Sequence, residues 1–144
     1  MLCAYPACFI KEENGYSVLF PDLGTATCGD TLDEAMRMAV DCLAGILYSM
    51  KKDGETPPPP SRPGEVDLEK VLAELYDEGE APPLSDAFVN LITVDVEEYA
   101  KRHFEKSVKK TLSIPAWLNE AALRAGLNFS QVLQEALKER LEAT

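Results

Sequence analysis

The chain has 144 residues, of which 46% are apolar and 27% are charged, a composition typical of one globular domain or two small ones. No apolar run approaches the roughly 18 residues that a membrane helix needs, and the N-terminus lacks the pattern of a secretory signal. We therefore expect a cytoplasmic protein without a membrane partner. In that reducing compartment the cysteines are expected to be small buried apolar residues rather than disulfides or metal ligands: Cys3, Cys8, Cys28 and Cys42.

Net charge divides the chain in two. Residues 1–100 carry 6 Lys and Arg against 20 Asp and Glu, a net charge of −14, whereas residues 101–144 carry 8 against 5, a net charge of +3. An acidic surface attracts basic proteins and repels nucleic acid, while a basic one can approach phosphate. An acidic excess can also serve solubility alone, so charge needs support from pattern.

The first hundred residues predict a small α/β module. Residues 2–10 and 16–20 are rich in aliphatic and aromatic side chains and are separated by Glu13-Asn14-Gly15, which predicts a β-hairpin. After the breaking segment 21–24, residues 25–28 predict a third short strand.

A long helix is expected next, with Asp30 or Thr31 as its cap and residues 51–54, Lys-Lys-Asp-Gly, at its end. Its apolar side chains follow the three-and-four spacing of a helix packed on a sheet: Leu32, Ala35, Met36, Ala39, Val40, Leu43, Ile46 and Leu47.

Residues 55–64, ETPPPPSRPG, cannot continue a helix or a central strand, because successive prolines remove backbone donors and fix φ. They predict an extended loop, which can be a rigid spacer or a proline ligand for a binding groove. A second helix over 68–76, capped by Asp67, and a fourth strand over 87–94 follow. We therefore expect an α+β fold with a small antiparallel sheet and helices on one face.

The C-terminal segment carries the most specific pattern. Between 108 and 114, Val108, Leu112 and Ile114 alternate with polar residues, although Lys110 falls on the apolar side. Pro115 opens a short helix that Gly126 ends, and Asn128 with Gln131 has the spacing of a capping box for a second helix. The order is strand, helix, helix.

Such a short segment cannot bury enough apolar surface to fold alone, and its strand would leave unpaired edge groups. The simplest partner is a second copy, whose strand would pair with the first in an antiparallel ribbon. The expected core of this homodimer consists of Leu112, Ile114, Val132, Leu133 and Leu137.

This pattern resembles the ribbon-helix-helix family of DNA-binding proteins. The resemblance implies that Lys109, Thr111 and Ser113 of each chain contact base edges in the major groove of operator DNA. It also implies that the turn at Asn128, Phe129 and Ser130 offers backbone N–H groups to a phosphate. The alternative is a polar strand face that is only solvated, in a tail that only dimerises. Further phosphate attraction is expected from Lys101, Arg102, Lys106, Lys109 and Lys110.

The N-terminal module is similar to the HicB family of antitoxins, one branch of which ends in a ribbon-helix-helix domain. The resemblance rests on the order of four segments: Tyr5-Pro6-Ala7, Gly15-Tyr16-Ser17-Val18, Phe20-Pro21-Asp22-Leu23 and Gly29-Asp30-Thr31-Leu32-Asp33-Glu34-Ala35. It implies a reduced RNase H-like fold over 1–105 that blocks HicA, a small basic toxin that cleaves messenger RNA. It also implies that residues 106–144 form the domain that represses the operon as a homodimer or higher oligomer. Residues 65–86 add a helix where a shorter loop is usual.

Two other classes of function stay open at this point. An RNase H-like nuclease would need acidic residues that converge on two metal ions, and the residues to consider are Asp22, Asp30, Asp33, Glu34 and Asp41. Turn and cap chemistry accounts for several of these, and His103 is the only histidine, so we expect no enzyme, no metal and no cofactor. A stand-alone regulator with a ligand-sensing N-terminal domain is the other alternative.

Overall fold

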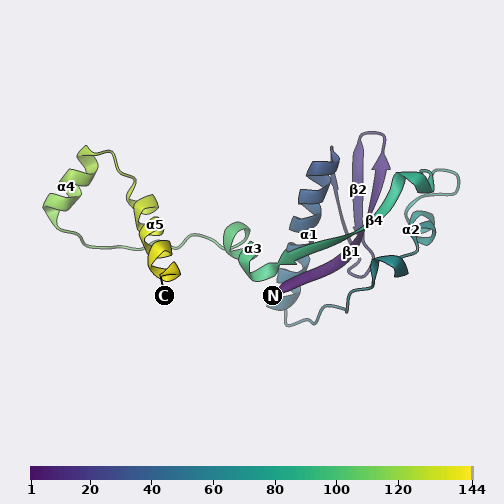
Figure 1. Cartoon of the computed structure of the whole chain (residues 1–144), viewed down its shortest axis with the longest axis horizontal. Coiled ribbons are helices and arrows are strands. Elements are labelled where there is room, and N and C mark those ends of the chain that lie inside the picture. Colours follow the sequence, from purple (N-terminus) through teal and green to yellow (C-terminus); the bar gives the residue numbers. More distant parts are fainter. Residues whose placement is uncertain (144) are drawn as a thin grey trace. The chain divides into compact units, whose positions relative to one another are not determined.

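The computed structural model describes residues 1–143 and divides into two compact units. Unit 1 is Met1–Lys106 and unit 2 is Ser107–Thr144, and Figure 1 shows the elements of each. Within residues 1–143, no helix combines the length and the apolar character that crossing a membrane requires.

Unit 1 is built on a four-stranded sheet with the order β3-β2-β1-β4. The strands are β1 (Leu2–Glu12), β2 (Gly15–Phe20), β3 (Thr25–Gly29) and β4 (Ala87–Asp95). All three pairings are antiparallel. The predicted hairpin, third strand and late fourth strand are confirmed, and β1 lies in the centre of the sheet between β2 and β4.

Helix α1 (Leu32–Lys52) packs on one face of this sheet. It begins where the Thr31 hydroxyl accepts a hydrogen bond from the Glu34 amide at 3.1 Å, as the sequence predicts. A Cβ on Gly29 would lie 2.4 Å from the amide nitrogen of Ala35, so only glycine allows the first turn of α1 to lie so close to β3. The core between helix and sheet consists chiefly of Ala35, Ala39, Leu43 and Leu47 against Tyr5, Ala7, Phe9, Val18 and Phe20.

The opposite face of the sheet is also covered, which corrects the prediction of helices on one face only. Cys8 and Ile10 point away from α1 and are fully buried. Helix α2 (Leu68–Leu75) buries Val71 and Leu72 and lies across the sheet from α1 (Figure 1). The Tyr76 hydroxyl at the end of α2 donates a hydrogen bond to Glu12. The unbroken buried run in β1, rather than an alternating one, is the mark of a strand covered on both faces.

The proline-rich segment crosses the surface of unit 1 between α1 and the 3₁₀ turn at Pro63–Glu65. The Tyr5 hydroxyl donates to the Pro58 carbonyl at 2.6 Å, and both the amide and the hydroxyl of Ser61 donate to the Asp22 carboxylate at 2.7 Å. These bonds fix the extended segment to the body of the unit. A second 3₁₀ turn, Leu84–Asp86, precedes β4.

Helix α3 (Val96–His103) is an element that the sequence analysis missed. The Asp95 side chain caps it by accepting from the Glu98 amide at 3.2 Å. Acidic residues occupy its first turn and basic residues its last, which suits the helix dipole. With only eight residues and few apolar positions, it left a weak periodic signal in a segment dominated by charge.

Unit 2 contains helices α4 (Ala116–Arg124) and α5 (Phe129–Glu142), with Gly126 at φ +68° between them. The Asn128 side chain caps α5 by accepting from the Gln131 amide at 3.1 Å. The Gln131 side chain bonds to Glu135, so only the forward half of the predicted capping box forms. Residues 107–115 adopt neither helix nor strand in the single chain. The predicted strand over 108–114 is absent here, because a strand needs a partner to complete its ladder.

The cysteines are less uniform than predicted. All four are free thiols, and Cys8 is buried, but Cys3 and Cys42 are only half-buried and Cys28 is exposed. Cys28 lies on the edge strand β3 with its side chain on the face away from α1, which explains its exposure.

Candidate functional site

The apolar side chains of unit 2 are exposed in the single chain. No residue between 107 and 143 is buried. The predicted dimer core shares this exposure: Leu112 is 61% exposed, Ile114 45%, Val132 45%, Leu133 36% and Leu137 53%. An apolar set of this size is the kind of surface that a partner covers. Its pairing with a second copy stays a prediction.

The predicted DNA-contacting residues form two groups. Asn128, Phe129 and Ser130 lie together at the start of α5, where the first-turn N–H groups of a 14-residue helix are available. Lys109, Thr111 and Ser113 are exposed and lie in the segment that has no regular structure. The fold of one chain therefore brings the three predicted phosphate contacts together at one helix start. The three predicted base contacts lie in a segment without strand structure.

The boundary between the units lies at residues 106 and 107, so the net charge of each unit differs from that of the two segments divided at residue 100. Unit 1 carries 9 Lys and Arg against 21 Asp and Glu, a net charge of −12, and unit 2 carries 5 against 4, a net charge of +1. The basic excess of the C-terminal third therefore straddles the boundary. Lys101 and Arg102 belong to α3 in unit 1, and Lys101 pairs with Glu98 at 3.3 Å.

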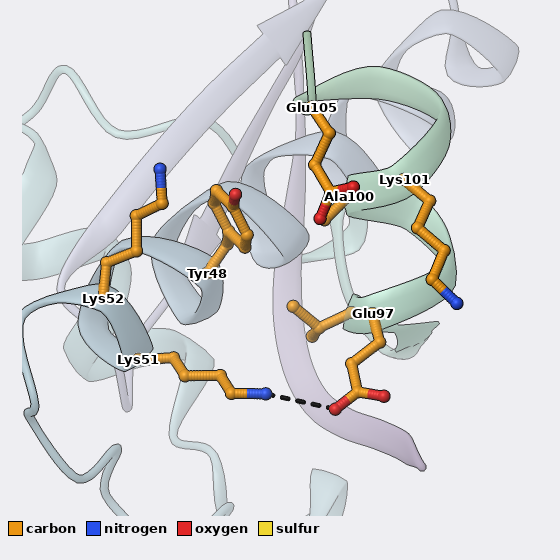
Figure 2. Close-up of a pocket in the computed structure, with 8 residues that line it drawn as sticks. Tyr48, Lys51, Lys52, Glu97, Ala100, Lys101 and Glu105 are labelled. Atoms are coloured by element: carbon orange, nitrogen blue, oxygen red, sulfur yellow. Dashed lines mark hydrogen bonds and ion pairs between the residues drawn. The ribbon is translucent and has the colours of Figure 1, made fainter. Parts of the chain in front are cut away.

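A shallow hollow of about 500 Å³ lies between the C-terminal part of α1 and α3 (Figure 2). The Lys51 ammonium donates to the Glu97 carboxylate at 3.1 Å, and this bond lowers the pKa of that carboxyl. The Lys52 ammonium lies 4.7 Å from the centre of the Tyr48 ring. The Lys51–Glu97 pair joins α1 to α3, whereas the contact of Lys52 with Tyr48 lies within α1.

Four of the five acidic residues considered for a nuclease, Asp22, Asp33, Glu34 and Asp41, have side chains with structural partners. Asp22 accepts from Ser61, Asp41 accepts from the Tyr99 hydroxyl at 2.9 Å, and Asp33 pairs with Arg37 at 3.2 Å. Glu34 accepts from the Asp30 amide at 2.9 Å. Among residues 1–143, no three His, Cys, Asp or Glu side chains gather in a group that could hold a metal ion. These acids stabilise turns, caps and helix packing.

Comparison with known proteins identifies the family. A family model described as a HicB-like antitoxin of bacterial toxin–antitoxin systems matches residues 5–136. The chain is 41% identical over 66 residues to Antitoxin HicB 2 of Photorhabdus laumondii, a match that covers 45% of this chain and 48% of that antitoxin. The chain thus spans about half the length of that relative.

Two broader matches cover most of the chain. An uncharacterised 14.9 kDa protein from the rep-hol intergenic region of Haemophilus phage HP1 is 30% identical over 115 residues, which is 79% of this chain and 74% of that protein. A chain in a toxin–antitoxin complex from Streptococcus pneumoniae is 31% identical, with a TM-score of 0.63, and the match covers 97% of this chain and 99% of that one.

The chain therefore belongs to the HicB-like antitoxin family. The family is regulatory rather than enzymatic. The family and the α+β class that the sequence analysis inferred are confirmed.

Proposed function

We propose that unit 1 binds and neutralises a HicA-type mRNA-cleaving toxin, while unit 2 dimerises as a ribbon-helix-helix domain and represses the operon that encodes both proteins. The exposed apolar side chains of unit 2 carry the proposal, because one chain leaves them uncovered and they follow the strand-helix-helix order that the sequence predicts. Unit 1 has a net charge of −12, which is complementary to the charge of a basic toxin.

Dimerisation and operator binding are coupled in this proposal. Two segments over 108–114 would pair as an antiparallel ribbon, which completes the ladder and places Leu112 and Ile114 in a common core with α5. The same pairing would order Lys109, Thr111 and Ser113 on the other face, where they reach base edges. The first turn of α5 at Asn128, Phe129 and Ser130 would then hold a phosphate.

Unit 1 needs no catalytic chemistry for its part. We propose that it is a reduced RNase H-like module that inhibits by covering the RNA-binding face of the toxin. The hydrogen bonds and ion pairs of Asp22, Asp33, Glu34 and Asp41 within unit 1 support this view.

Two assays on one preparation test the proposal. The full chain and residues 1–106 are each mixed with the purified toxin encoded beside this gene, and RNA cleavage is followed. Both proteins should stop cleavage, and only the full chain should shift operator DNA in a gel. Continued cleavage with no complex would refute neutralisation by unit 1. Operator binding by residues 1–106 alone would refute the role of unit 2.

A further inference from the structure

The negative charge of unit 1 is concentrated in one segment. Residues 65–86 carry eight Asp and Glu against one cation, Lys70, so this segment holds −7 of the net −12. Within residues 1–143, Glu65 is the only one of these acids in an ion pair, with Arg62 at 3.9 Å. A partner with positive charge would relieve the repulsion among the others.

This segment also contains a hollow, which we call the α2 hollow. Its volume is about 390 Å³, and its apolar and aromatic lining consists of Leu72, Ala73, Tyr76, Ala81 and Leu84. Gly79 and three exposed carboxylates complete the lining; the carboxylates are those of Glu69, Asp77 and Glu78. Leu72 is only 5% exposed at its base, whereas Leu84 is 45% exposed and open to a partner.

The α2 hollow is held in place by the sheet beneath it. The Tyr76 hydroxyl donates to Glu12 in β1, and burial together with this hydrogen bond raises the pKa of Tyr76 to about 12, so the donor stays protonated. Asp67 caps α2 by accepting from the Lys70 amide at 3.2 Å. A site that is ordered before binding loses less entropy when its partner arrives.

We propose that the α2 hollow is the toxin-docking surface, which receives an apolar side chain that projects from a basic surface of the HicA-type toxin. This inference rests on the proposed function. The carboxylates exclude the phosphates of RNA or DNA as occupants. They also disfavour a second copy of this chain, which has a net charge of −11. An apolar anchor surrounded by opposite charge is the usual anatomy of a strong protein interface.

The test compares two full-chain variants with equal charge change. The first is E69Q/D77N/E78Q in the α2 hollow. The second is E13Q/D53N/E55Q, at positions that are also exposed but lie outside the hollow. Surface plasmon resonance with the toxin encoded beside this gene should show an association rate constant about tenfold lower or more for the first variant. The second variant should change that rate constant by less than about threefold.

A third variant tests the apolar part of the α2 hollow. Ala73 is exposed on α2, so A73W fills the hollow without disturbing the core. It should abolish inhibition of RNA cleavage while the melting temperature stays within a few degrees of wild type. Normal inhibition by A73W would overturn the inference.

The remaining outcomes distinguish a failure of the α2 hollow as the docking surface from a failure of the proposed function. Equal losses in the two charge variants, or no loss in either, would overturn the inference while toxin neutralisation by the wild type still upholds the proposed function. A changed oligomeric state of E69Q/D77N/E78Q without toxin would assign the α2 hollow to a second copy and also overturn it. A wild-type chain that neither binds nor inhibits the toxin would instead refute the proposed function itself.

Discussion

The two units of this chain differ in the burial of their apolar side chains. In unit 1, Phe9, Phe20 and Leu43 are fully buried between the sheet and α1. In unit 2, Leu112 and Leu137 also belong to apolar patterns but remain more than half exposed. Amphipathic spacing is therefore the same signal for an internal core and for an interface. A core and an interface can be told apart only by whether a single chain buries the apolar side chains. Their exposure in unit 2 is what we expect of a surface that binds a partner.

The largest expected effect is a loss of DNA binding without a change in toxin binding or dimerisation. The triple substitution K109A/T111A/S113A should lower operator affinity by at least about 10⁴-fold, because a dimer loses six side chains and each specific contact contributes about 1–3 kcal/mol. Fluorescence anisotropy with labelled operator measures the loss. Toxin binding and dimerisation should be unchanged, and K11A in unit 1 is the single-charge control. Unchanged operator affinity in the triple variant would remove this segment as the base-reading element.

The second effect breaks unit 1 alone. Leu43 is fully buried, so L43A should lower the free energy of unfolding of unit 1 by about 2–5 kcal/mol. Urea unfolding followed by circular dichroism detects this change. Trp117, the only tryptophan, lies in unit 2, so its fluorescence reports that unit separately. The Trp117 transition should not move, and a parallel shift of both signals would contradict the independence of the units.

The third effect depends on whether two chains meet. Leu133 is 36% exposed in one chain, so L133A would cost little in a monomer. In a dimer core it should weaken association by about 30-fold, or about 2 kcal/mol. Sedimentation at several concentrations measures the dissociation constant. The matched control is L2A, at a position 67% exposed in unit 1, which should change nothing. Equal behaviour of the two variants would argue against Leu133 as a core residue.

The smallest effect concerns the attachment of α3 to α1. The hydrogen bond from Lys51 lowers the pKa of Glu97 in the folded chain. The stabilisation from this pair is therefore complete above the unfolded pKa and is lost as the pH falls through the folded pKa. An NMR titration should show the pKa of Glu97 rising in K51M. A pKa of Glu97 that K51M leaves in place would mean that Lys51 is not the cause.

The elements that the sequence predicted well are those whose signals are local. Asn14-Gly15 marks the hairpin, Thr31 caps α1, and Asn128 caps α5, and each acts within a few residues of its position. The burial of both sheet faces was missed because it depends on α2, which is more than fifty residues from β1 in the chain. Helix α3 was missed because charge obscures its short apolar periodicity.

The candidate site was predictable only in part, for a related reason. The family could be inferred from the order of short motifs in residues 5–35, because three of the four motifs lie at a turn or a helix cap, where local sequence decides the structure. The α2 hollow could not be predicted from the sequence, because Leu72, Tyr76 and Leu84 come together only when α2 and the turn at Leu84–Asp86 pack on the sheet. The proposed ladder over 108–114 is absent from one chain, because its hydrogen-bond partners would belong to a second copy.

Whether unit 2 is complete only as a pair is tested most directly by sedimentation velocity combined with hydrogen exchange of the amides in residues 108–114. We predict a dimer at micromolar concentration, with these amides protected in proportion to the dimer fraction and unprotected on dilution. A monomer with the same amides protected at every concentration would contradict the account.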